Sequence, residues 1–367
     1  MNKKYFVSAV FAAFLAVSCH QVPSRNPNGI YMATANMENV VDFSKKIKLP
    51  SPQKVDIGGV GFTGFKVLDS AIVVSAKGQS GVLRFYRKND MAALGSFLNI
   101  GKSKEEVAYS PTLSNFSSFY RENDSLYADV FDFVKRRLLT FNVDECLKDK
   151  RTVLKSEYKE IASPTFTIVR LPDGKYFIKQ LEDHETRQIR SIRDLKTGDV
   201  TITPIMKELN EASVKKSEDI NVLSTITRVG KDGRIFEMPV GLNYLNIYTP
   251  DGAFEKTVCI GEKADDIDEV MNTSRWKRKY TFSDIRVFDN FFGVVKIDEE
   301  EAAYQTKRTK MPSILLFNLD GEPLAQIDMK RQITSFDVDV QKGILYTLDS
   351  QTEEFLKYDI SKWLKNL

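Results

Sequence analysis

One supersecondary pattern recurs six times along this chain of 367 residues. A short polar turn is followed at once by an apolar, aromatic-rich run. The six instances begin at Asp69, Asp124, Asp173, Asp232, Asp289 and Lys342, and they stand 49 to 59 residues apart. Self-similarity at a period of this size is typical of repeat architectures, so the repeat constrains the fold more than any local feature does.

Each repeat contains enough strand-like sequence for a small antiparallel sheet. The stretches "YLNIYTPDGAFEKTVCIG" (244–261) and "ILLFNLDGEPLAQIDM" (314–329) both read as two strands joined by a tight turn. Asp-Gly, Asp-Asn and Lys-Gly provide the positive φ angles of such turns, and Val, Ile, Phe and Tyr suit a pleated surface. Four strands per unit in six units predict an all-β fold, a six-bladed β-propeller of four-stranded antiparallel blades.

The last repeat lacks its fourth strand. It stops at "FLKYDIS" (355–361), whereas the run "DFSKKIKLP" (42–50) precedes the first repeat and has no other partner. A propeller left open would expose an unpaired strand edge. We therefore predict that residues 42–50 close the ring as the fourth strand of the last blade.

The N-terminus has the form of an export signal. Lys3 and Lys4 precede an apolar run of fourteen residues, which is shorter than the roughly 20 residues that cross a bilayer but suits a signal peptide. Cys19 follows, so the segment resembles a bacterial lipoprotein signal, in which the cysteine is lipidated and becomes the new N-terminus. The alternative is an ordinary secretory signal with an incidental Cys19. The expected organisation is a signal peptide (1–18), a tether (19–40) and the propeller (41–367).

Charge and cysteine content exclude several classes of protein. Loss of Lys3 and Lys4 with the signal lowers the formal charge from +3 to +1, and a near-neutral chain argues against nucleic-acid binding. Cys146 and Cys259 each lie in a strand-like run far apart in the chain. We expect two buried free thiols and no disulfide framework.

The blade pattern and two blade ends carry a family resemblance. The stretches "NIGKSKEEV" (99–107) and "CIGEKADDI" (259–267) lie where TolB-like propellers tend to have a glycine-rich turn with an acidic residue, and Gly101 and Gly261 match. Over roughly residues 40–360 the chain resembles the TolB-like six-bladed propeller lipoproteins of Bacteroidota. The resemblance implies an outer-membrane lipoprotein, facing either the periplasm or the cell surface.

Most catalytic motifs are missing. The chain has two histidines, His20 and His184, which argues against His-rich zinc sites and Ser-His-Asp catalysis. It has no P-loop, nucleophile elbow or Cys-x-x-Cys pair. Two acid pairs, Asp129 with Asp132 and Asp337 with Asp339, could in principle bind calcium, but alternating acids on the polar side of a strand explain them as well. We predict no cofactor and no bound metal.

The longer loops are expected on one face of the propeller. They are the segments 101–115, 155–163, 206–222, 261–280 and 297–310. Long loops on a rigid scaffold are where binding usually resides. Within "SRWKRKY" (274–280), Arg275 and Trp276 are candidate ligand-binding residues. The alternative is a solvated basic loop with Trp276 packed onto a blade.

A second candidate site is a column of residues near the end of the first strand of each blade. The column comprises Lys66, Arg121, Arg170, Arg228, Arg286 and Asp339. First strands line the central channel of a propeller, so these side chains could form a basic ring that binds a small carboxylate or phosphate. Alternatively, they point into blade interfaces or out to solvent.

These features favour a binding module over an enzyme. We predict a monomeric, lipid-anchored propeller in the cell envelope that binds an unknown protein or a small anionic ligand through its long-loop face. It would contact the membrane through Cys19 and would bind no nucleic acid. The alternative is a propeller enzyme of the lactonase, lyase or hydrolase type, with its active centre at the channel mouth.

Overall fold

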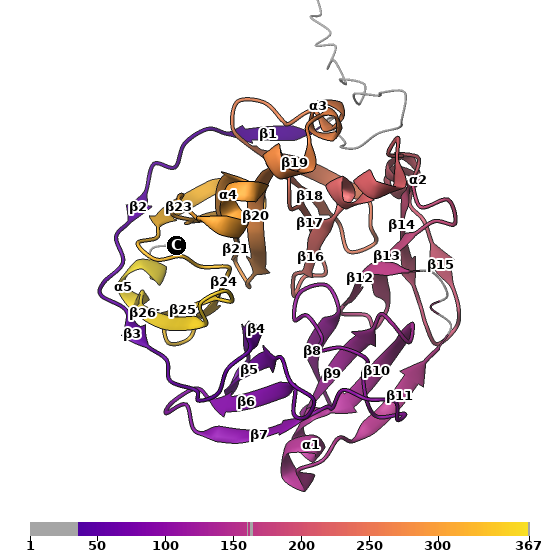
Figure 1. Cartoon of the computed structure of the whole chain (residues 1–367), viewed down its shortest axis with the longest axis vertical. Helices are drawn as coiled ribbons and strands as arrows, with labels where there is room; N and C mark the ends of the chain where they lie inside the picture. Colours follow the sequence, from indigo (N-terminus) through magenta and orange to yellow (C-terminus); the bar gives the residue numbers. More distant parts are fainter. Residues whose placement is uncertain (1–35, 160, 162–163, 366–367) are drawn as a thin grey trace, which may run out of the picture.

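The computed structural model describes residues 36–159, 161 and 164–365, and the predicted lipidation site Cys19 lies outside this part of the chain. The described residues form a closed ring of six blades around a central axis (Figure 1). The predicted six-bladed β-propeller is therefore confirmed.

Each blade is a four-stranded antiparallel sheet. Blade 1 comprises β4 (Phe62–Val67), β5 (Ala71–Ala76), β6 (Leu83–Arg87) and β7 (Ala93–Phe97). Blade 2 comprises β8 (Ser117–Glu122), β9 (Ser125–Asp132), β10 (Arg137–Asn142) and β11 (Leu154–Tyr158). Blade 3 comprises β12 (Thr165–Arg170), β13 (Tyr176–Leu181), β14 (Gln188–Arg193) and β15 (Val200–Thr201).

The second half of the ring repeats this order. Blade 4 comprises β16 (Thr225–Val229), β17 (Ile235–Pro239), β18 (Tyr244–Tyr248) and β19 (Phe254–Ile260). Blade 5 comprises β20 (Lys279–Val287), β21 (Phe291–Glu300), β22 (Ser313–Asn318) and β23 (Pro323–Asp328). Blade 6 comprises β24 (Ser335–Asp339), β25 (Ile344–Asp349), β26 (Glu354–Asp359) and β3 (Gln53–Lys54). From blade 2 through blades 3, 4, 5 and 6 to blade 1, the first strands of consecutive blades contact one another, which places them around the axis.

The N-terminal segment runs around the outside of the ring (Figure 1). It pairs in parallel with the outer strand of blade 4 through β1 (Met37–Val40) and with that of blade 5 through β2 (Lys46–Ile47). It then pairs antiparallel with β26 through β3. One segment of about twenty residues thus ties three blades together.

Closure of the ring by an N-terminal strand is confirmed, but the prediction that residues 42–50 supply it is wrong. Residues 42–50 cross blade 5, where Phe43 and Ile47 are buried in the apolar cores around that blade. The closing strand β3 has two exposed residues and therefore gives no hydrophobic signal. The next residue, Val55, is buried, and its backbone N–H donates to the carbonyl of Phe355 at 2.8 Å.

The hydrophobic core lies between the blades. Each pair of neighbouring blades encloses a cluster of buried side chains, and aromatic rings fill the larger ones. Between blades 4 and 5, the rings of Phe236 and Phe317 flank that of Phe292, each at 5.0 Å between centroids. Cys146 and Cys259 are buried free thiols, as predicted, and burial raises the pKa of each to about 11.

The helices of the described residues are short and occupy loops. They are α1 (Val143–Asp149), α2 (Pro204–Asn210), α3 (Ile267–Asn272), α4 (Glu301–Thr306) and α5 (Ser361–Leu364), with two 3₁₀ turns, η1 (Ser217–Leu223) and η2 (Arg275–Lys277). None of them is long and apolar enough to span a bilayer.

Candidate functional site

Strand order places the long connections on one face of the ring. The loops from one blade to the next and those between second and third strands lie on the same side, here called the long-loop face. They include residues 98–116, 202–224, 261–278 and 301–312. On the opposite face the turns between first and second strands have two to five residues, and a connection between third and fourth strands holds α1.

Two of the predicted loops are shorter than expected. Residues 154–158 form β11, the fourth strand of blade 2, so the first four residues of the predicted loop 155–163 are strand. Residues 297–300 complete β21. β11 is the outer strand of blade 2, where one side faces solvent and charged residues are accepted. β21 is an inner strand, and its charged residues Asp298 and Glu300 lie at its end, next to the loop that holds α4.

The predicted basic column lies near the ends of the first strands, toward the face opposite the long loops. The structure brings three of its six members together: Lys66 of β4, Arg228 of β16 and Arg286 of β20. Asp284 of β20 and Asp337 of β24 lie among them. We call these five residues the axial cluster.

Contacts within the axial cluster cross the centre of the ring. The guanidinium of Arg286 in blade 5 donates to Asp284 Oδ2 at 2.8 Å and to the carbonyl of Phe65 in blade 1 at 3.0 Å. Arg228 in blade 4 donates to Asp284 Oδ1 at 3.1 Å. The side chains of first strands from separate blades therefore meet on the axis.

Electrostatically the axial cluster has three cations and two carboxylates. Asp337 accepts from the backbone N–H of Val67 at 2.8 Å, and burial raises its pKa. The side chain of Lys66 forms no hydrogen bond or ion pair with any described residue. Burial lowers the pKa of Lys66 to about 8, with Arg286 and Arg228 acting in the same direction and Asp337 opposing them. Lys66 is the surplus charge of the cluster.

The other three members of the column do not join this cluster. Arg121 is half-exposed and donates to Asp69 at 3.2 Å. Arg170 lies over the ring of Tyr120, at 3.9 Å from its centroid. Asp339 forms a buried ion pair at 2.8 Å with Lys88, from the neighbouring blade 1. The column is therefore divided among the axis, the blade interfaces and the surface.

Arg275 and Trp276 lie on the long-loop face, in η2 between blades 4 and 5. Trp276 is 57% exposed, so it does not pack down onto a blade. The Arg275 guanidinium lies 5.4 Å from the indole centroid and 3.6 Å from Glu301 Oε1. The pair presents a flat aromatic surface beside a positive charge.

The acid pairs considered for calcium binding have other partners. Asp129 accepts from the hydroxyls of Tyr176 and Thr140, each at 2.7 Å. Asp132 lies 3.8 Å from Arg137 and accepts from the N–H of Ala108. Within the described ranges, no three His, Cys, Asp or Glu side chains converge in the manner of a metal site. His184 is exposed in the turn between β13 and β14.

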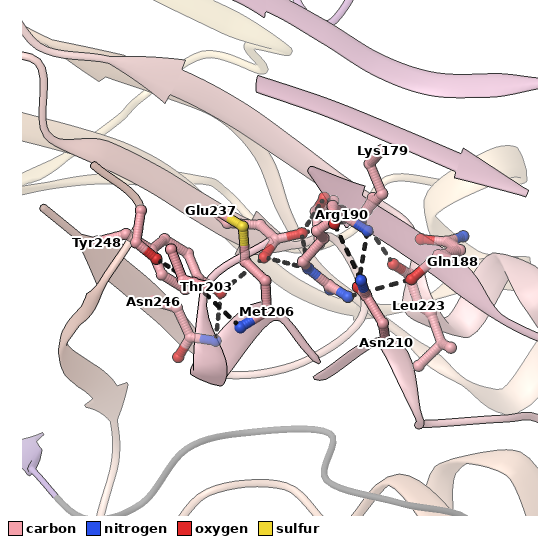
Figure 2. Close-up of polar contacts among 12 residues, drawn as sticks. Lys179, Gln188, Arg190, Thr203, Met206, Asn210, Leu223, Glu237, Asn246 and Tyr248 are labelled. Carbon is pink, nitrogen blue, oxygen red and sulfur yellow. Dashed lines mark hydrogen bonds and ion pairs between the residues drawn. The ribbon is translucent and has the colours of Figure 1, made fainter. Parts of the chain in front are cut away.

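The structure also contains a buried charge network that the sequence reasoning missed (Figure 2). It lies between blades 3 and 4, where Lys179 of β13 and Arg190 of β14 face Glu237 of β17. The Lys179 ammonium is 3.1 Å from Glu237 Oε1, and Arg190 Nε is 2.9 Å from Glu237 Oε2. All three side chains are at most 10% exposed.

Neutral groups complete this network. Tyr248 donates its hydroxyl to Glu237 Oε2 at 2.8 Å, and Lys179 donates to the carbonyl of Leu223 at 3.2 Å (Figure 2). Burial alone would raise the pKa of Glu237, but Arg190 and Lys179 hold it far below its usual range. Burial lowers the pKa of Lys179 to about 8. The sequence signal was a single charged residue inside each of two largely apolar strands, Lys179 in β13 and Glu237 in β17, whereas Arg190 lies in the polar sequence QIRSIR of β14.

No family model and no curated protein sequence matches this chain. Among solved structures it is similar to a member of the DUF4221 family from Bacteroides vulgatus, with a TM-score of 0.51 and 13% identity over 85% of this chain and 96% of that one. A protein of Bacteroides fragilis named as exported gives a TM-score of 0.49 at 11% identity, covering 88% and 98% of the two chains. Virginiamycin B lyase from Staphylococcus aureus gives 0.40 at 10%, covering 84% and 88%.

Identities this low show the fold alone. The chain is a six-bladed β-propeller, and its function has to be inferred from its own surface and buried groups.

Proposed function

We propose that this chain is a TolB-like lipoprotein of the cell envelope that binds a protein or a small ligand through its long-loop face. It is anchored in the outer membrane through a lipid on Cys19, facing either the periplasm or the outside of the cell. The propeller serves as a rigid scaffold for the loops.

The distribution of exposed apolar side chains is the observation that carries this proposal. Ten large apolar side chains of the described residues are at least 46% exposed, and seven of them lie in loops of the long-loop face: Val60, Tyr109, Phe133, Val134, Ile202, Trp276 and Met311. The other three are Val41 in the N-terminal segment, Val200 in β15 and Val340 in a turn of the opposite face. Exposed apolar groups gathered on one face favour an interaction surface, because scattered single residues would show no such bias.

Aromatic stacking adds to the case on blade 2. The ring of Phe133 stacks between those of Tyr109 and Phe116, with centroids 5.7 and 6.1 Å away. Tyr109 is 62% exposed and Phe133 is 49% exposed. Pre-ordered aromatic rings can contribute binding energy at a small entropic cost, and aromatic residues are enriched at the centres of interfaces.

The acids near the axis favour a binding role over the enzyme alternative. Asp284 accepts from Arg228 and Arg286, and Asp337 accepts from backbone N–H groups. A general acid or a metal ligand at the channel needs a carboxylate that is free to meet the substrate or ion. These two carboxylates already have partners.

Site-specific photocrosslinking in intact cells tests the proposal. Benzoylphenylalanine replaces Trp276 on the long-loop face, and in a matched control it replaces Val340 on the opposite face. We expect discrete crosslinked adducts from position 276 and none of comparable yield from position 340. Equal yields at both positions, or no adduct from position 276 or from a second probe at Tyr109, would contradict the proposed face.

A further inference from the structure

A cavity of about 260 Å³ lies at the rim of the long-loop face, between blades 4 and 5. The N-terminal segment forms one of its walls through Val40, Val41 and Phe43. Ile260 at the end of β19 and Leu315 of β22 form the floor side, since both are buried. Met311, which is 56% exposed, stands in the loop before β22. We call this cavity the rim pocket.

The polar part of the rim pocket has an unbalanced positive charge. Lys296 in the middle of β21 lines the pocket and is half-buried, and its side chain forms no hydrogen bond or ion pair with any described residue. The one acid in the lining, Asp298, already has two lysines, Lys279 at 3.2 Å and Lys310 at 3.8 Å. The ammonium of Lys296 is thus the group of the pocket that lacks a counter-charge.

Two neutral polar groups next to Lys296 are also engaged. Ser313, which pairs with Lys296 across the sheet, donates to Asp328 at 3.0 Å. Gln326 donates to the same carboxylate oxygen at 2.5 Å. Asp328 therefore accepts hydrogen bonds from Ser313 and Gln326, and Lys296 is left as the group of the pocket that can bind an anionic ligand.

We propose that the rim pocket binds a monocarboxylate with a short aliphatic tail, with the carboxylate at Lys296 and the tail against Val40, Phe43 and Met311. The inference rests on the proposed function, because the pocket lies on the long-loop face. A volume of about 260 Å³ is just below the range of about 300–1,000 Å³ that holds drug-sized ligands, so the ligand is small. The pocket has one cation without a counter-charge, Lys296, so a ligand with one negative charge suits it better than a ligand with two.

The energy of such binding is divided between the tail and the charge. Each methylene group buried against the apolar wall contributes about 0.8 kcal/mol. The ion pair in a partly enclosed pocket adds a charge-assisted hydrogen bond, which is stronger than a neutral one. A ligand with the tail but no negative charge should therefore bind more weakly, and one with a positive charge should not bind.

Methionine methyl NMR of the mature chain, with octanoate as the probe, tests the proposal. The Met311 signal, identified by a Met311→Leu variant, should shift saturably, whereas the signals of Met91 and Met206 should stay in place and report an intact fold. Lys296→Gln should weaken octanoate binding at least tenfold. Lys357→Gln, a half-buried strand lysine in blade 6, is the matched control and should leave binding unchanged.

Three further ligands sharpen the result. 1-Octanol should bind more weakly than octanoate, and octylamine should cause no saturable shift. A monocarboxylate with an aliphatic tail can be a fatty acid or the C-terminus of a peptide, and N-acetyl-leucine distinguishes the two. Tighter binding of N-acetyl-leucine than of octanoate indicates a peptide C-terminus, and weaker binding indicates a fatty acid. An unmoved Met311 signal at millimolar octanoate, unchanged binding in Lys296→Gln, or equal binding of octylamine would overturn the rim pocket. Such a result would leave the proposed function untouched, because crosslinking at position 276 tests the long-loop face independently of the rim pocket.

Discussion

Two buried charge clusters of this propeller each contain one more cation than carboxylate. In the network between blades 3 and 4, Lys179 and Arg190 share Glu237, and in the axial cluster three cations share two acids. Burial penalises the charged form of a lysine, so the surplus cation of each cluster has a lowered pKa. In such a cluster, loss of a carboxylate should therefore lower the free energy of unfolding much more than loss of the surplus lysine.

Removal of the carboxylate from the network should be more harmful than removal of its lysine. Glu237→Gln leaves two buried cations without a counter-charge, and we expect it to lower the free energy of unfolding by about 3–5 kcal/mol. Lys179→Met leaves Arg190 and Glu237 as a balanced pair and should cost clearly less. Urea denaturation of both variants measures the difference. A cost for Lys179→Met equal to or above that of Glu237→Gln would refute this account of the network.

Lys66 should make stability depend on pH in the alkaline range. Its pKa is about 8 in the folded protein and near 10.5 in the unfolded chain, so the unfolded chain holds more protons between these values. The free energy of unfolding therefore rises with pH across this window. Lys66→Met should stabilise the protein at pH 7 by on the order of 1 kcal/mol. This is less than the full shift of the Lys66 pKa implies, because the side chain is half-buried and solvent screens its charge.

The comparison of wild type and Lys66→Met by urea denaturation at pH 7 and pH 9.5 measures this effect. The gap between them should narrow at the higher pH, where Lys66 of the folded wild type is neutral. A gap that stays constant or widens would show that Lys66 is not the group responsible.

At the scale of elements, the N-terminal segment has two separate roles. β1 and β2 lie on the outer strands of blades 4 and 5, which already have four strands each. β3 is itself the fourth strand of blade 6 and covers the edge of β26. An uncovered edge presents unpaired backbone groups to other chains.

Truncation at two positions separates these roles. A chain that begins at residue 51 loses β1 and β2 but keeps β3, so we expect a monomer with a lower melting temperature, because burial of Phe43 and Ile47 is lost. A chain that begins at residue 57 also loses β3 and Val55, and it should form oligomers. Light scattering after gel filtration and thermal melting measure both. Oligomers of the longer chain, or a stable monomer of the shorter one, would contradict the assignment of closure to β3.

For the whole molecule, the division between the two faces of the ring is the feature most relevant to function. Loops, 3₁₀ turns and exposed apolar side chains gather on the long-loop face, whereas the opposite face consists of tight turns apart from α1. A protein held at a membrane by its N-terminus can present such a face to a partner. This arrangement requires the proposed anchor as well as the fold.

The anchor is tested by Cys19→Ala. A buried lipid chain contributes about 0.8 kcal/mol per CH₂ group to membrane attachment, so the variant should move from the membrane fraction to the soluble fraction. The melting temperature of the propeller should be unchanged, because the substitution lies outside the blades. Fractionation of cells, with the wild type as control, gives the result. A Cys19→Ala protein that stays in the membrane fraction at wild-type levels would exclude the lipid anchor.

The sequence by itself determined the number of blades, the four antiparallel strands expected in each blade and the closure of the ring by an N-terminal strand. These features follow from local patterns: an alternating apolar run, a turn with positive φ such as Gly252 or Gly321, and a regular spacing. A repeat of this size has few other ways to bury its apolar face, so the pattern leads directly to the fold.

Only the tertiary structure decided which charged residues meet. Arg228 meets Asp284 of the next blade, and Lys179 meets Glu237 of the next blade, so each contact depends on how whole blades are placed around the ring. The closing strand β3 was also invisible in the sequence, because its two residues are exposed and its position is set by the hydrogen bonds of β26. Local hydrophobic periodicity reports which side of a strand is buried, but it carries no information about which residue of another blade lies opposite.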